Sequence, residues 1–184
     1  MKKFLLIIVL AVVLLGIVIP QFFLDPTYAM DRSTVIDAKP GAITRVVADL
    51  RTWDSWTAWN SEVDPTIARA YIGTPGEPGH KMTWTSDELG NGSIEITTIE
   101  PTRVAYKMRI DDWDPSSGAF VMKPAADGTT AVTWELSGEI NGFPAKRYFG
   151  LLMDRMVGGD FEEGLTKLKA KVEGLTASPD PQGE

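Results

Sequence analysis

The sequence predicts an α+β domain in which an antiparallel sheet of about seven strands packs against one long C-terminal helix. Short segments of β-type residues follow one another from residue 31 to residue 140, with turn sequences between them. Apolar residues at helical spacing then continue from Phe149 to Val172. Strands that follow one another through short turns pair antiparallel and commonly leave one face in water.

An apolar segment precedes this domain. Lys2 and Lys3 are followed by an uncharged, almost wholly apolar run over residues 4–24, which is long enough to cross a bilayer as a helix. Because lysines beside such a helix stay in the cytoplasm, we expect a single-pass membrane protein with an extracytoplasmic domain, either periplasmic or at the cell surface. The alternative is a cleaved signal peptide with a poor cleavage site at residues 27–29. Residues 1–29 are therefore assigned to an anchor or a signal peptide.

The domain is predicted to begin with a strand over residues 31–39 and a turn at Pro40. A helix should follow, because its apolar residues fall at helical spacing: Ile43, Val46, Val47 and Leu50. Three tryptophans come next at intervals of three residues, Trp53, Trp56 and Trp59. A tryptophan buries ~150–250 Å², so these rings must fill a large space. They form either ordinary core or one wall of an apolar cavity.

Six further strands are expected, over residues 66–73, 81–86, 93–100, 103–110, 119–123 and 131–140. Alternation is clearest in the fourth of these, where Val104, Tyr106 and Met108 share one face. Titratable residues at strand positions are few: Arg69, Glu95, Tyr106 and Glu135. The two glutamates alternate with apolar neighbours, so we place them on the solvent face. Tyr106 either offers a buried hydroxyl to a ligand or, as we favour, bonds to the backbone in the core.

The last helix should extend to Gly174 and lie across the sheet. Gly158, Gly159 and Gly164 interrupt its apolar stripe. They indicate a bend in the helix, close packing of the helix on the sheet, or the absence of side chains where a ligand needs room. The sequence thus predicts a domain over residues 30–175 and a polar, disordered tail over residues 176–184.

Composition excludes several classes of function. The chain has no cysteine and a single histidine, His80, so thiolate chemistry and multi-histidine metal sites lack ligands. We expect neither a metal nor a cofactor. The net charge of -7 repels phosphate backbones, and no basic patch offsets it, so nucleic-acid binding is not expected.

Three segments resemble the SRPBCC superfamily, the START-related and polyketide cyclase/dehydrase-like proteins. They are residues 32–40 with the tryptophan run that follows, residues 128–134 with Gly138, and residues 159–169. Membrane-anchored members with one N-terminal helix are similar to this chain. The resemblance implies a helix-grip fold, in which a curved sheet wraps around the C-terminal helix and leaves an apolar cavity. Members typically bind lipids, sterols or polyketides, a minority are enzymes, and no catalytic motif is shared by all of them.

We therefore expect a membrane-tethered protein that binds a hydrophobic small molecule or lipid, and we favour a binding protein over an enzyme. The predicted ligand-binding residues are the inward-facing aromatic, methionine and aliphatic side chains: Trp53, Trp56, Trp59, Trp84, Val104, Tyr106, Met108, Phe120, Met122, Trp134, Leu136, Met153, Met156, Val157 and Phe161. No catalytic residue is predicted. Two alternatives stay open: a cyclase- or hydrolase-like enzyme on this fold, and a protein-interaction module whose cavity is filled by its own side chains.

Overall fold

The computed structural model describes residues 2–23, 25–141 and 147–177. Its elements in chain order are α1 (Lys2–Phe23), β1 (Thr27–Ile36), α2 (Pro40–Val47), the 3-10 helix η1 (Leu50–Ser55), β2 (Ala68–Ile72), β3 (Lys81–Thr85), β4 (Gly92–Glu100), β5 (Arg103–Ile110), β6 (Ser116–Pro124), β7 (Thr130–Glu139) and α3 (Arg147–Ala177).

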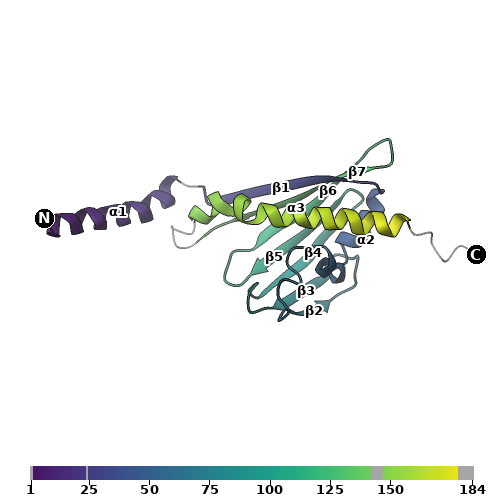
Figure 1. The fold of residues 1–184 in the computed structure, drawn as a ribbon, viewed down its shortest axis with the longest axis horizontal. Helices are drawn as coiled ribbons and strands as arrows, with labels where there is room; N and C mark the ends of the chain where they lie inside the picture. Colours follow the sequence, from purple (N-terminus) through teal and green to yellow (C-terminus); the bar gives the residue numbers. More distant parts are fainter. Residues whose placement is uncertain (1, 24, 142–146, 178–184) are drawn as a thin grey trace, which may run out of the picture.

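The seven strands form one sheet in the order β1-β7-β6-β5-β4-β3-β2, and every neighbouring pair is antiparallel. The long helix α3 lies across one face of this curved sheet, with α2 and η1 near its C-terminal half (Figure 1). This is the predicted α+β class and the helix-grip arrangement. The first strand pairs with the last, so β1 and β2 are the two edge strands.

Alternation places the core side chains as predicted. In β5 the buried residues are Val104, Tyr106 and Met108. In β7, Trp134 and Leu136 point the same way, toward α3. On the other face, Glu95 and Glu135 reach solvent and form ion pairs with Lys81 and Arg103, as expected for a solvent face.

Two strands begin three or four residues before their predicted starts, and the other strand boundaries shift by no more than three residues. β1 begins at Thr27, because residues 27–30 pair with the end of β7 at residues 136–139. β6 begins at Ser116, inside a segment predicted to be a loop. A side chain on Gly118 would collide with the ring of Tyr106, so this small residue belongs to the packed sheet despite its loop-like character.

Helix α3 runs without interruption to Ala177, so the helix end predicted at Gly174 is wrong. The first two residues of the predicted disordered tail are helical, and the rest of that tail lies outside the described residues. Two of the glycines permit close packing: a Cβ on Gly164 would lie 2.9 Å from Cζ3 of Trp134, and one on Gly158 would collide with the guanidinium of Arg32. A Cβ on Gly159 would meet nothing within 4 Å.

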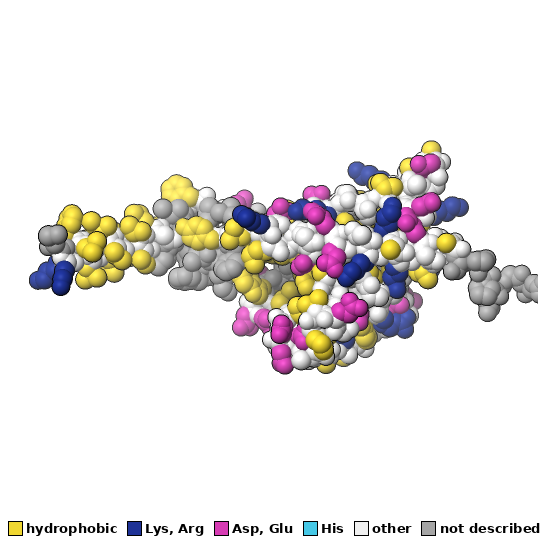
Figure 2. All heavy atoms as spheres, in the orientation of Figure 1, with side chains coloured by type: hydrophobic (Ala, Val, Ile, Leu, Met, Phe, Trp, Pro, Cys, Tyr) yellow, Lys and Arg dark blue, Asp and Glu magenta, His cyan; other side chains and the backbone are white. Residues whose placement is uncertain are grey.

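Helix α1 projects away from the domain, and its hydrophobic side chains lie on the surface (Figures 1 and 2). Phe22 and Phe23 are 75% and 79% exposed. In the described ranges, no helix is both long enough and apolar enough to cross a membrane. The expected spanning helix is not shown, and membrane attachment stays a prediction.

Candidate functional site

Two adjoining cavities lie between the sheet and the helical elements. The larger, of about 290 Å³, is bounded by the N-terminal half of α3 and the ends of β1, β5 and β7, and we call it the large chamber. Its lining residues are Tyr28, Trp59, Met108, Ile110, Trp113, Asp114, Ser116, Leu136, Glu139, Ile140, Met153, Met156 and Val157. In Figure 2, hydrophobic side chains gather on the surface beside this half of α3.

The second cavity, the small chamber, has a volume of about 120 Å³ and lies among η1, the segment after it, and strands β2 to β5. Its lining residues are Trp53, Asp54, Thr57, Trp59, Ile67, Arg69, Met82, Trp84, Leu89, Ile94, Met108 and Ile110. Trp59, Met108 and Ile110 line both chambers. These three side chains therefore form the partition between them.

The structure divides the predicted ligand-binding residues into two groups. The first group lines one or both chambers: Trp53, Trp59, Trp84, Met108, Leu136, Met153, Met156 and Val157. The second group is buried away from both chambers and fills the core: Trp56, Val104, Tyr106, Phe120, Met122, Trp134 and Phe161. The tryptophan run thus contributes both to the core and to a cavity wall.

The filled part of the core is built around Trp134. Its ring stacks on Phe161 at a centroid distance of 4.0 Å and on Phe120 at 5.0 Å. Its indole nitrogen donates a 2.8 Å hydrogen bond to the Tyr106 hydroxyl. Tyr106 is therefore bonded to a side chain, not to the backbone as predicted, and burial raises the pKa of its hydroxyl. Tyr106 therefore belongs to the packed core and not to the wall of either chamber.

Several chamber residues were missed by the sequence prediction. Met82 and Ile94 alternate with polar neighbours in β3 and β4, and their buried faces could have been assigned by the same rule that identified β5. Tyr28 was assigned to the N-terminal anchor or signal peptide, so it was not considered as a residue of a cavity wall. Trp113 and Asp114 lie in the turn between β5 and β6 and border the large chamber from there.

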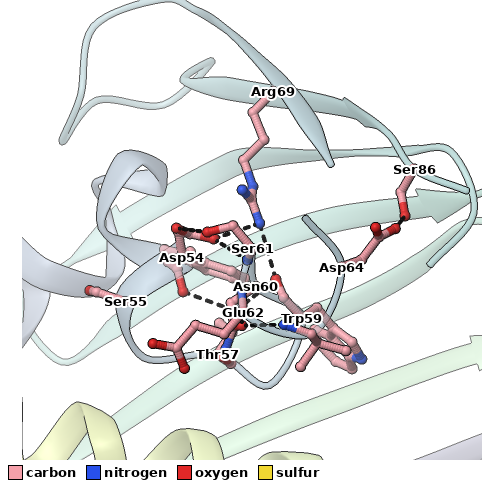
Figure 3. Close-up of polar contacts among 12 residues, drawn as sticks. Asp54, Ser55, Thr57, Trp59, Asn60, Ser61, Glu62, Asp64, Arg69 and Ser86 are labelled. Carbon is pink, nitrogen blue, oxygen red and sulfur yellow. Dashed lines mark hydrogen bonds and ion pairs between the residues drawn. The ribbon is translucent and has the colours of Figure 1, made fainter. Parts of the chain in front are cut away.

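Polar groups border both chambers, and those of the large chamber include the carboxylates of Asp114 and Glu139. In the large chamber, the Tyr28 and Ser116 hydroxyls form a 2.7 Å hydrogen bond with each other. In the small chamber, Arg69 of β2 forms an ion pair with Asp54 of η1, with 2.8 Å between Nη2 and Oδ1 (Figure 3). The Ser61 backbone N–H and hydroxyl also donate to Asp54, at 2.8 and 2.7 Å.

These contacts favour the ionised form of the Asp54 carboxylate. Burial of the carboxylate opposes its ionisation, but the hydrogen bonds from Ser61 and the charge of Arg69 outweigh burial and lower the pKa of Asp54. A general acid near neutral pH needs a carboxyl whose pKa is raised. Asp54 is therefore suited to holding Arg69 and unsuited to giving a proton to a ligand.

A second carboxylate fixes the loop beside the small chamber. Asp64 is 1% exposed and accepts a hydrogen bond from the Ser86 hydroxyl (Figure 3). It also accepts hydrogen bonds from the backbone N–H and hydroxyl of Thr66. Hydrogen bonds from Ser86 and Thr66 lower the pKa of Asp64. This network joins the segment before β2 to the turn after β3, so it positions Ile67 and Leu89 in the chamber wall.

His80 lies outside both chambers. It is 1% exposed, its Nδ1 is 3.2 Å from the carbonyl oxygen of Ile72, and its Nε2 is 3.7 Å from Asp49. In the described part of the chain, no group of three or more His, Cys, Asp or Glu side chains is placed to hold a metal ion.

Comparison with protein families gives a match over most of the chain. A family model described as polyketide cyclase / dehydrase and lipid transport matches residues 28–173. This range contains every strand except the first residue of β1, and nearly all of α3. No curated protein matches the sequence.

Solved structures share the fold at low identity. TTHA0849 from Thermus thermophilus is 19% identical, with a TM-score of 0.59 over 84% of this chain and 100% of that chain. Norcoclaurine synthase from Thalictrum flavum is 10% identical, with a TM-score of 0.56 over 83% of this chain and 88% of that chain. The di-domain ARO/CYC protein BexL of the BE-7585A biosynthetic pathway is 16% identical, with a TM-score of 0.59 over 82% of this chain and 48% of that chain. At these identities the likeness establishes the fold and leaves the ligand open.

Proposed function

The chain belongs to the polyketide cyclase / dehydrase and lipid transport family, and we propose that it binds a hydrophobic small molecule or lipid in its two chambers while α1 holds it at a membrane. The observation that carries the binding proposal is the pair of chambers, of about 290 and about 120 Å³, which share the partition of Trp59, Met108 and Ile110. Apolar pockets with a few placed polar groups are the usual form of small-molecule sites.

The walls favour an adaptable apolar guest. Met108, Met153 and Met156 are unbranched and polarisable, so they can fit irregular ligand shapes. Trp59 and Trp113 add flat faces to the same chamber. Burial of a ligand there would be driven by the hydrophobic effect at ~25 cal/mol per Å² of apolar area.

The polar groups favour binding over catalysis. Asp54 is held ionised by Arg69, and Tyr106 is bonded to Trp134 away from both chambers. An enzyme of acid–base type that used the small chamber would need a titratable group there with its pKa moved toward neutrality, and the pKa of Asp54 is moved the other way. The open chambers likewise argue against a module whose core is completely filled.

Membrane attachment is supported by the surface of α1. Its apolar side chains in the described part of the helix are exposed, for example Leu6 at 67% and Leu10 at 66%. Exposed apolar surface of this extent is typical of a membrane or protein contact. Lys2 and Lys3 at its start favour a cytoplasmic N-terminus and an extracytoplasmic domain.

The position of Tyr28 favours a retained N-terminal segment. Cleavage after Ala29 would remove the first three residues of β1, which pair with residues 137–139 of β7. It would also remove Tyr28 from the wall of the large chamber and from its hydrogen bond with Ser116. A mature protein that begins at Met30 would contradict the anchor proposal, and N-terminal sequencing of protein from membrane and supernatant fractions tests it.

The binding proposal is tested on the full chain in lipid nanodiscs, with empty discs as the reference. Fluorescent fatty-acid and polyaromatic probes are titrated while tryptophan emission is followed. Met156→Glu is the test variant, because Met156 lines the large chamber yet is 58% exposed, so the variant should fold. A carboxylate in the apolar wall should weaken binding ~10-fold or more.

Leu152→Glu is the matched control. Leu152 lies one helical turn earlier on α3 and is 48% exposed, but it does not line either chamber. Equal loss of binding in both variants would indicate a general effect of charge on α3. Absence of saturable binding by any probe would overturn the proposal in favour of an interaction module.

A further inference from the structure

The small chamber is apolar except at one side, where a charged pair lies. Asp54 and Arg69 are its only charged lining residues within the described ranges, and Thr57 is the remaining polar one. A guanidinium beside an apolar cavity is costly unless its N–H groups are hydrogen-bonded. The contacts of Arg69 therefore bear directly on what the chamber can hold.

Arg69 is held by two acceptors at the same nitrogen. Its Nη2 lies 2.8 Å from Oδ1 of Asp54 and donates a 3.3 Å hydrogen bond to the carbonyl oxygen of Trp59 (Figure 3). The Arg69 side chain is 11% exposed. The guanidinium is thus pinned at one corner, between η1 and the partition residue Trp59.

The other donors of this guanidinium are not used by the protein. Arginine has five N–H groups, and both contacts of Arg69 with described residues go to Nη2. Nε and Nη1, which carry the remaining three N–H groups, find no acceptor among the described residues. Because arginine only donates, the matching ligand group is a hydrogen-bond acceptor.

We propose that Arg69 donates to an uncharged acceptor oxygen, such as a ketone, ester or amide carbonyl, of a hydrophobic ligand whose apolar body occupies the chambers. This inference rests on the proposed binding function and adds to it the chemical class of the ligand. Arg69 acts as a specificity residue, and Asp54 and Ser61 hold it in position.

The choice of an uncharged acceptor follows from charge balance. Asp54 already neutralises Arg69 across 2.8 Å, so a ligand carboxylate would leave one uncompensated negative charge in the site. The whole chain is also acidic, with a net charge of -7, which disfavours the approach of anions. A carbonyl oxygen takes the hydrogen bond without adding charge.

The test uses three ligands with the same aromatic body: 2-acetylnaphthalene, 2-ethylnaphthalene and 2-naphthoate. They compete with a polyaromatic probe for the full chain in nanodiscs, and empty discs correct for partition into lipid. The ketone should bind ~10-fold more tightly than the ethyl analogue, because it gains a hydrogen bond to a charged donor. The carboxylate should bind less tightly than the ketone.

The test variant is Arg69→Met combined with Asp54→Asn, which removes both charges together and leaves no unpaired carboxylate. It should bind the ketone and the ethyl analogue equally. The control is Arg103→Met with Glu135→Gln, a solvent-facing pair on the outer face of the sheet at 3.3 Å. The control should keep the preference for the ketone.

The outcomes separate this inference from the proposed function. Equal affinities for the ketone and the ethyl analogue in the unaltered chain would overturn this inference and leave the proposed function in place. Tighter binding of the carboxylate would also overturn it, because the ligand class would then be anionic. A preference for the ketone that survives in the Arg69 and Asp54 variant would assign the acceptor contact to another group and so overturn the role of Arg69. Failure of all three ligands to bind would overturn the proposed function as well.

Discussion

The two halves of α3 cover the same sheet but do different things. The middle and the C-terminal half contribute Phe161, Leu165, Leu168 and Val172, each no more than 2% exposed. The N-terminal half contributes Met153, Met156 and Val157, which border the large chamber. We call the two regions the filled half and the hollow half of the domain.

The difference lies in what faces each half. Trp134 rises from the sheet and stacks on both Phe120 and Phe161, and Trp56, the residue after η1, closes the filled half. In the hollow half, Met108 and Leu136 face α3 across the large chamber. Close packing gives most of the stability of a core, so stability and binding are expected to separate along one helix.

The largest contrast is expected from truncation to alanine. Phe161→Ala should lower the free energy of unfolding by ~3–5 kcal/mol, because it opens a cavity beneath Trp134. Met156→Ala should lower it by less than ~1 kcal/mol, because Met156 is already 58% exposed. Urea unfolding followed by tryptophan emission measures both values. Similar losses in the two variants would mean that the halves are packed alike.

Enlarged side chains provide the opposite test. Val104 is fully buried in the filled half, so Val104→Phe should cost ~1–3 kcal/mol through overpacking. Ile110 faces both chambers, so Ile110→Phe should change stability by no more than ~0.5 kcal/mol while reducing probe binding. If Ile110→Phe lowers the stability as much as Val104→Phe does, the partition has no free space beside it.

Glycine replacements should give a smaller contrast within α3 itself. Gly159→Ala should stabilise the domain by ~1 kcal/mol, because the new methyl group meets nothing within 4 Å. Gly164→Ala should not gain this amount, because its Cβ would lie 2.9 Å from the Trp134 ring. Equal stabilisation by both, measured as urea midpoints, would contradict close packing at Gly164.

Acid should loosen the wall of the small chamber first. The hydrogen-bonded Asp64 carboxylate has a lowered pKa in the folded state, so its stabilisation is present above pH ~4. That stabilisation is lost as the pH falls through the folded pKa. Amide exchange, corrected for its intrinsic pH dependence, should rise in residues 64–67 and 86–89 before β6 and β7. Asp64→Asn should remove this difference in amide exchange between the two groups of residues. If residues 64–67 and 86–89 of that variant still exchange before β6 and β7 as the pH falls, the prediction is wrong.

The fold was predictable because its signals are local. Alternation in β5 and β7 placed Tyr106, Met108 and Trp134 on the inner face, and helical spacing identified α3. Local sequence patterns failed where contacts with a distant part of the chain determine the secondary structure. Ser116 and Gly118 have the character of a loop, yet they lie in β6, where the Tyr28 hydroxyl hydrogen-bonds to Ser116 and the Tyr106 ring packs against Gly118.

The candidate site was predictable only in part for the same reason. Met156 and Phe161 both fit an apolar helix stripe, and only their partners on the sheet determine that one borders a cavity and the other fills the core. Arg69 was recognised as a titratable strand residue, but its pairing with Asp54 depends on how η1 meets β2. Such long-range contacts have no signature in a short stretch of sequence.

The junction between α1 and β1 limits how far the domain can travel. Only residues 24–26 separate Phe23 from Thr27, and four Cα–Cα steps of ~3.8 Å span at most ~15 Å. With α1 held in a bilayer, as proposed, this short connection keeps the start of β1 close to the lipid headgroups. Tyr28, which lines the large chamber, then lies there as well. The domain would then sample the molecules dissolved in that layer and have almost no reach into the surrounding fluid.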